Sequence, residues 1–165
     1  MTTISSYDSP LGKITLASRG CKLVGLWFDG QKYDRAGIED EIVEGSDDAI
    51  LQARRWLDIY FSGKNPEFLP PLETSGSEFR RMVAEIMLSI PYGETVTYGQ
   101  IAREIALRTG KEHVSAQAVG GAVGHNPISI IIPCHRVLGS NGSLTGYAGG
   151  IDRKRTLLQL EGILL

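Results

Sequence analysis

The 165-residue sequence predicts an α+β protein, with a small antiparallel sheet in its first half and a mainly helical second half. Residues 3–8, 13–18 and 22–28 are short apolar or β-branched runs separated by Gly- and Pro-containing turns, a pattern typical of paired strands. After the segment 65–75, which holds three prolines, apolar residues recur at helical spacing instead. We therefore predict two domains, residues 1–76 and residues 77–165.

Each predicted helix before residue 90 has its own start or stop signal. A helix over residues 49–61 places Ile50, Ala53, Leu57 and Tyr60 on one face, and Ser62-Gly63 follows it as a stop. Ser77 is a good N-cap for a second helix that runs to about residue 89. Its apolar face is formed by Phe79, Val83, Ile86 and Met87.

Residues 95–124 predict two short helices joined by a polar turn. The first begins at about Thr97 after an extended stretch, and residues 108–113 form the turn. Ser115 caps the second helix, residues 116–124. This arrangement is that of a helix-turn-helix, although any helical hairpin would give the same pattern.

The helix over residues 116–124 has almost no bulky side chain. Glycine inside a helix costs about 0.5–1 kcal/mol relative to alanine. We expect that something approaches this helix closely. Either a neighbouring part of the protein core or a nucleic-acid backbone would fit.

The sequence around Cys134 predicts a positioned nucleophile. The run 130–132 consists of three isoleucines and indicates a short buried strand that ends at Pro133. Cys134 would then lie where the strand gives way to a turn. His135 and Arg136 would supply a base and a positive field, both of which favour the thiolate.

Composition excludes several classes of protein. Residues 1–8 have no basic region and no long apolar stretch, so we expect no secretory signal, and no apolar run reaches transmembrane length. Two distant cysteines and three dispersed histidines give no zinc-ligand spacing, so we predict no metal. Because no secretory signal or membrane span is expected, we predict a cytoplasmic protein with reduced thiols. Residues 1–76 hold eight basic and twelve acidic residues, whereas residues 77–165 hold nine and seven. The second half is therefore the better candidate for binding an anionic partner.

Several ordered motifs resemble one family, the O6-alkylguanine-DNA alkyltransferases, also called methylated-DNA–protein-cysteine methyltransferases. Pro133-Cys134-His135-Arg136-Val137 resembles its active-site signature, and Asn126-Pro127 precedes the cysteine by the family's spacing. The stretches 91–98, 118–122, 144–150 and 160–162 resemble its helix-turn-helix entry, recognition helix, base-covering loop and last element. The resemblance implies a ribonuclease-H-like N-terminal domain.

The resemblance also implies roles for individual residues in alkyl transfer. Cys134 would take the alkyl group from O6 of guanine, and His135 would act on Cys134 as a base through a bound water. Glu161 would orient His135, and Asn126 would order the turn around the cysteine. Tyr98 would donate a proton to the departing base. The transferred group would stay on the sulfur, so each molecule would act once, without a cofactor.

The implied partner is double-stranded DNA that carries O6-alkylguanine, bound through its minor groove by a monomer. Residues implied to hold the flipped base are Val137, Tyr147, Ala148 and Gly149. Residues implied to contact DNA are Thr97, Tyr98, Gln117, Ala118, Gly120, Gly121 and Arg136. Gln117 occupies the position of the family's arginine finger, which fills the gap left by the extruded base, and this departure affects base extrusion.

Two other functions are compatible with parts of the sequence. An alkyltransferase-like protein would bind the lesion with weak or no transfer, but such proteins replace the cysteine that is present here. A Cys-His hydrolase unrelated to DNA would leave the glycine-rich helix and the stretch 95–106 without a role.

Overall fold

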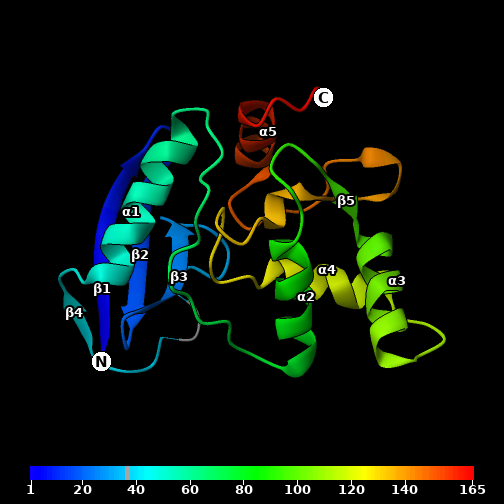
Figure 1. Ribbon diagram of the computed structural model, residues 1–165, viewed down its shortest axis with the longest axis horizontal. Helices are drawn as coiled ribbons and strands as arrows, with labels where there is room; N and C mark the ends of the chain where they lie inside the picture. The colour runs from blue at the N-terminus through cyan, green and yellow to red at the C-terminus, as the bar shows by residue number, and fades with distance from the viewer. Residues whose placement is uncertain (36–37) are drawn as a thin grey trace. The chain divides into compact units, whose positions relative to one another are not determined.

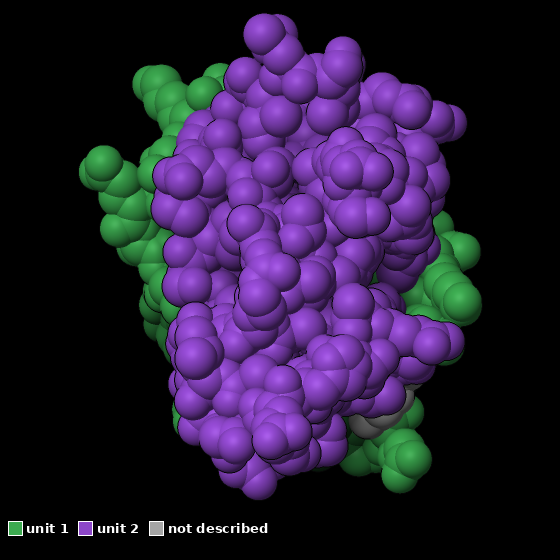
Figure 2. Space-filling view, turned by 90° about the vertical axis from the view of Figure 1, so that its right-hand side faces the viewer, with its two compact units in different colours: residues 1–74, 127–129 green, residues 75–126, 130–165 purple. Residues whose placement is uncertain are grey.

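The chain forms two compact units in the computed structural model, which describes residues 1–35 and 38–165 (Figure 1). Unit 1 consists of residues 1–74 and 127–129, and unit 2 of residues 75–126 and 130–165 (Figure 2). The sequence-based division at residue 76 did not anticipate that 127–129 belong with unit 1. Every predicted site residue lies in unit 2.

Unit 1 is built on a four-stranded sheet with the order β3-β2-β1-β4. The predicted strands are confirmed as β1 (Thr2–Ser9), β2 (Gly12–Arg19) and β3 (Lys22–Phe28), which pair antiparallel. The fourth strand, β4 (Ile42–Glu44), was not predicted, and it pairs parallel with β1, so the sheet is mixed rather than antiparallel. Its three residues are all exposed, so no alternation of burial marks it in the sequence.

One helix, α1 (Asp48–Phe61), packs across β1, β2 and β3. Asp47 caps it by accepting a hydrogen bond from the Ile50 amide, and the apolar face buries Leu57 and Tyr60 completely. At the β3 edge, the Leu26 amide donates to the Pro127 carbonyl. This hydrogen bond adds residues 127–129 to the sheet edge of unit 1.

Unit 2 contains four α-helices among its described residues: α2 (Glu78–Leu88), α3 (Tyr98–Thr109), α4 (Ala116–Gly124) and α5 (Ile151–Leu160). Ser77 and Ser115 cap α2 and α4 as predicted. Thr97 caps α3 through a reciprocal pair of hydrogen bonds with Gln100. The helix α3 ends at Gly110, whose left-handed backbone (φ 71°) is easily adopted by glycine.

A short parallel pair connects the helical part of unit 2 with the cysteine segment. Strand β5 (Val96–Thr97) leads directly into α3 and pairs with β6 (Val137–Leu138). Helices α3 and α4 are neighbours joined by residues 110–115, which is the predicted helix-turn-helix arrangement (Figure 1).

The predicted strand over residues 130–132 is wrong. All three isoleucines are buried, but they form a turn, and Ile130 has a left-handed backbone with φ 69°. A short apolar run is compatible with a buried strand and with a buried turn, because burial of its side chains stabilises either conformation. Cys134 therefore begins a 3-10 helix, η1 (Cys134–Arg136), rather than ending a strand.

Candidate active site

Cys134 is fixed in a buried position by the turn that precedes it. Cys134 is only 5% exposed, and its amide donates a hydrogen bond to the Ile132 carbonyl at 2.8 Å. The same carbonyl accepts a hydrogen bond from Nδ2 of Asn126 at 2.9 Å. Asn126 thus holds the turn before the cysteine, the arrangement expected from its predicted role.

His135 and Glu161 form a fully buried pair. His135 Nε2 lies 2.6 Å from Glu161 Oε2, and neither side chain is exposed. Burial alone raises the pKa of Glu161, but hydrogen bonds and charges from His135 and Arg136 outweigh this effect and lower the pKa to about 2. Glu161 is therefore a carboxylate at neutral pH.

The ionised Glu161 determines the tautomer of His135. Burial lowers the pKa of His135, the bond to Glu161 raises it, and the charges of Arg136 and Lys154 lower it further, so the net shift is downward. The neutral imidazole carries one proton, and a carboxylate can only accept, so the proton lies on Nε2. Nδ1 is then the basic nitrogen, which can receive a proton from the Cys134 thiol.

Arg136 is buried rather than placed at the protein surface. It was expected at the DNA surface, yet it is 7% exposed. Its Nε donates to Glu161 Oε1 at 2.8 Å, and Nη1 donates to the Ile90 carbonyl at 2.8 Å. The guanidinium therefore faces the carboxylate of the buried pair. The position of Arg136 after Cys-His gave no sign of this, because the 3-10 turn that directs the side chain inward was not predicted.

Lys154 is a site residue that the sequence interpretation missed. It is completely buried on α5, and its Nζ donates to the carbonyls of Val137 (2.6 Å), Thr145 (3.1 Å) and Gly146 (3.2 Å). Burial lowers the pKa of Lys154 to about 8, and the charge of Cys134 acts in the opposite direction. Lys154 is therefore a buried cation whose charge and that of Cys134 interact.

A signal for Lys154 was present in the sequence. In the triplet 153–155, the middle residue precedes Leu157 and Leu158 by three and four positions, which places it on the buried face of α5. The helix itself was not predicted, so this spacing went unused.

Tyr98 and the loop before α5 lie together. The Tyr98 hydroxyl donates to the Thr145 carbonyl at 3.2 Å, and Lys154 Nζ lies 6.0 Å from the centre of its ring. Burial is the main cause that raises the pKa of Tyr98, so the phenol keeps its proton and can donate it. In the same loop Tyr147 and Ala148 are half-buried and Gly149 is buried. The Val137 carbonyl, expected to contact the base, already accepts from Lys154.

The glycines of α4 are not required by packing inside the protein. A methyl group added at Gly121 would meet nothing within 4 Å, and one at Gly120 would meet only the Tyr98 ring at 3.9 Å. Gln117 and Ala118 are exposed beside them, and Thr97 is half-exposed at the start of α3. Of the two explanations for this bare helix, a close neighbour within the core is therefore not supported.

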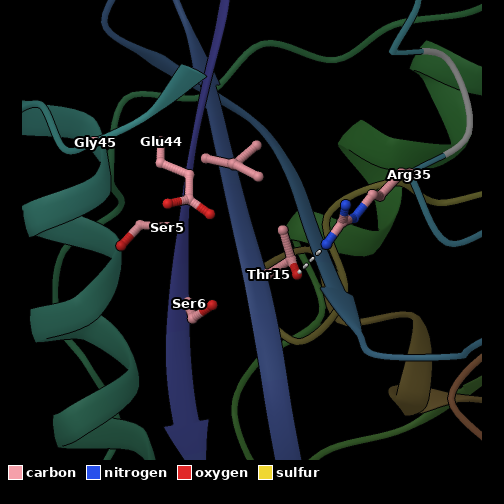
Figure 3. A pocket seen from close by; sticks show the side chains of 7 residues that line it. Ser5, Ser6, Thr15, Arg35, Glu44 and Gly45 are labelled. Carbon is pink, nitrogen blue, oxygen red and sulfur yellow. Dashed lines mark hydrogen bonds between the residues drawn. The ribbon is translucent and has the colours of Figure 1, made fainter. Parts of the chain in front are cut away.

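Unit 1 has a hollow of its own, with a volume of about 360 Å³ (Figure 3). In it the Arg35 guanidinium reaches the Thr15 hydroxyl on β2 at 3.5 Å, and Glu44 lies on β4, with β1 between the two strands. No predicted site residue lines it. Elsewhere in the described part of the chain, no cluster of three or more His, Cys, Asp or Glu could hold a metal ion, and no helix could span a bilayer.

Comparisons with known proteins agree with this geometry. Residues 78–163 match the family described as 6-O-methylguanine DNA methyltransferase, DNA binding domain, and residues 3–74 match its ribonuclease-like domain. The methylated-DNA–protein-cysteine methyltransferase of Mycolicibacterium paratuberculosis is 45% identical over 98% of this chain and 93% of its own length. That of Methanosarcina acetivorans is 42% identical over 94% of this chain and 96% of its own.

Solved structures extend the similarity to the whole fold. The crystal structure of the Mycobacterium tuberculosis O6-methylguanine methyltransferase superposes with a TM-score of 0.82, at 43% identity, covering 98% of this chain and 93% of that one. The same enzyme in complex with DNA gives a TM-score of 0.81, over 96% of this chain and 92% of that one. Because both halves match the family's two domains, the chain belongs to the 6-O-methylguanine DNA methyltransferase family.

Proposed function

We propose that this protein repairs DNA by a single transfer of the methyl group of O6-methylguanine to Cys134. The proposal rests on the buried pair of His135 and Glu161. His135 directly follows Cys134 in the sequence. This pair supplies a base whose proton-accepting nitrogen and counter-charge are both fixed before substrate arrives.

The first step is removal of the proton from the Cys134 thiol. His135 Nδ1 accepts it through a bridging water, and Glu161 stabilises the imidazolium that forms. A cysteine near its ordinary pKa of about 8.5 is mostly protonated at neutral pH, so this transfer is needed to make a nucleophile. Lys154 contributes a second positive charge toward the thiolate.

The second step forms the bond between sulfur and the methyl carbon and breaks the bond between that carbon and O6. The electron pair of the broken bond goes to the guanine, which takes a proton from the Tyr98 hydroxyl, and solvent returns a proton to the phenolate. The product is a neutral thioether. Since a thioether is a poor leaving group, Cys134 is not regenerated and the protein is consumed.

DNA would be contacted through α4 and the start of α3. The exposed, nearly bare surface formed by Gln117, Ala118 and Gly121 suits close contact with a minor groove. Extrusion of the damaged base into the site costs a few kcal/mol. Gln117 carries no charge to fill the gap, which reduces the contribution of this position to extrusion. The partner is double-stranded DNA, bound by a monomer in the cytoplasm.

Mass spectrometry tests the proposal directly. The protein is mixed with an equimolar duplex that carries one O6-methylguanine, and the modified peptide is mapped. The expected result is a gain of one methyl group on Cys134 with no second turnover. Cys134→Ser should bind the same duplex and gain no mass, whereas Cys21→Ser, which changes an exposed thiol in unit 1, should be methylated like the wild type. Tight binding without a mass change in the wild type would instead indicate a lesion-recognition protein.

A further inference from the structure

We propose that Arg136 is a positioning residue for the transfer reaction, which holds Glu161 and keeps His135 neutral as a base. The inference rests on the proposed function, because it assigns a role within that reaction. It replaces the DNA contact that the sequence suggested for this arginine.

The two oxygens of Glu161 are divided between different partners. Oε1 accepts from Arg136 Nε at 2.8 Å and from the Gly93 amide at 2.9 Å. Oε2 is thereby directed at His135 Nε2, 2.6 Å away. Two donors on one oxygen fix the plane of the carboxylate, and with it the orientation of the imidazole.

Arg136 is itself held at a second point. Its Nη1 donates to the Ile90 carbonyl at 2.8 Å, and its guanidinium carbon lies 5.7 Å from the centre of the Tyr92 ring. The planar fork of an arginine can make both contacts at once, whereas the single ammonium of a lysine cannot reproduce that geometry. The segment 90–93 and the residue after α5 are thus connected through one side chain.

The charge of Arg136 matters as much as its shape. A buried carboxylate needs a compensating cation. Among the described residues, the charged or titratable groups that act on His135 are Glu161, Arg136 and Lys154, and Tyr92 faces both Glu161 and Arg136. Because a guanidinium is always protonated, Arg136 compensates Glu161 permanently. His135 does not have to be protonated for this purpose and remains able to accept the thiol proton.

The test compares Arg136→Met, which removes the charge, with Arg136→Lys, which keeps it. Arg155→Met serves as the control, since Arg155 lies on α5 with a half-exposed side chain. Single-turnover methyl transfer to protein from O6-methylguanine duplex is measured across pH 5–9, together with duplex affinity and Tm. Loss of a partner that orients a metal ligand typically costs roughly 10- to 100-fold in affinity or activity, and we expect a loss of the same order for a group that orients Glu161.

For Arg136→Met we expect a loss in that range at neutral pH and a shift of the acid limb of the rate profile to higher pH. Without the guanidinium, the protonated imidazole of His135 is favoured, which moves the acid limb to higher pH. Arg136→Lys should lose rate while its acid limb stays near that of the wild type. Duplex affinity should be unchanged in both variants.

Three results would overturn the proposal. A wild-type rate in Arg136→Lys would show that the fork is unnecessary, and this variant remains informative if Arg136→Met does not fold. An unshifted acid limb in folded Arg136→Met would leave a structural role only. Loss of duplex affinity with an unchanged rate in the bound complex would restore the DNA contact.

One readout does not depend on methyl transfer. The pKa of the His135 imidazole, followed by NMR in the free protein, should be higher in Arg136→Met than in the wild type and in Arg155→Met. If the wild type failed to accept a methyl group, the proposed function would fall, and this titration would still decide whether Arg136 controls the protonation of His135.

Discussion

At the scale of single residues, the chemistry of the site depends on ionisable groups that are buried with their partners. Glu161 is the clearest case, because its side chain is inaccessible and receives donors from His135, Arg136 and Gly93. Such an arrangement stabilises the protein only while every member is present. Removal of one partner of a buried ion pair typically costs about 3–5 kcal/mol.

We therefore expect Glu161→Gln to be strongly destabilised near neutral pH and to transfer methyl groups poorly. The pKa of Glu161 is lowered from 4.5 to about 2 in the folded protein, so its contribution is present above pH 4.5 and is lost as pH falls toward 2. That contribution is about 3 kcal/mol. Denaturant unfolding of both proteins between pH 2 and pH 7 should show their difference in unfolding free energy shrinking through this window. A difference that stays constant with pH would contradict the assignment.

A second pH dependence, in the alkaline range, is expected from Lys154, whose charged form is disfavoured by burial. Its pKa is lowered from 10.5 to about 8, so between these values the unfolded chain binds more protons than the folded one. The stability of the wild type should therefore rise with pH in this window relative to Lys154→Met, which has no proton to lose. Urea titrations from pH 7 to pH 10.5 measure the difference, and parallel curves would refute it.

The same variant should also reduce methyl transfer at pH 7. Lys154 connects the Val137 carbonyl to the loop that contains Thr145 and Gly146, and methionine offers no donor to replace these bonds. A full transfer rate in Lys154→Met would show that the loop is held without it.

At the scale of elements, caps were the most informative part of the sequence. Ser77, Thr97 and Ser115 begin α2, α3 and α4 at the predicted residues, because each satisfies amides that the helix leaves without internal partners. These signals are local and can be read without knowledge of the fold. The two helices of the helix-turn-helix were predictable for the same reason, whereas their arrangement was not distinguishable from that of any helical hairpin.

Elements whose stability comes from distant partners were not predictable. Ile130 turns through a left-handed backbone because the surrounding core buries it, although isoleucine disfavours that conformation. The three exposed residues of β4 are a strand only because β1 pairs with them. Arg136 illustrates the consequence for the site, since its side chain points inward to partners that lie 25 and 46 residues away in the sequence.

On the bare surface of α4, one substitution should change protein stability and DNA binding in opposite directions. Gly121→Ala should stabilise the protein by about 0.5–1 kcal/mol, because alanine is the better helix former and the added methyl group meets nothing within 4 Å. The same methyl group should weaken duplex binding if DNA approaches the helix closely. Thermal unfolding and fluorescence anisotropy measure the two effects.

Gly124→Ala is the matched control for this experiment. Gly124 ends the same helix and also has room for a methyl group, but it is not among the residues expected to contact DNA. Equal loss of affinity in both variants, or none in Gly121→Ala, would contradict close approach at Gly121.

At the scale of the whole molecule, charge and chemistry are distributed unequally. Unit 1 contains none of the predicted site residues, and residues 1–76 carry the excess of acidic groups. The site lies entirely within unit 2, whose residues have only a small excess of basic groups. Affinity for DNA should therefore depend less on phosphate contacts than on the surface of α4 and on capture of the base.

This distribution predicts a weak dependence of duplex binding on salt. Each neutralised phosphate contributes about −0.9 to the slope of log K against log salt concentration, so we expect a slope shallower than about −4. Gln117→Arg makes the measurement diagnostic. An arginine that fills the space of an extruded base neutralises no phosphate, so transfer from duplex DNA should accelerate while the slope stays unchanged. A slope steeper by about 0.9, with no gain in rate, would place residue 117 against the backbone instead.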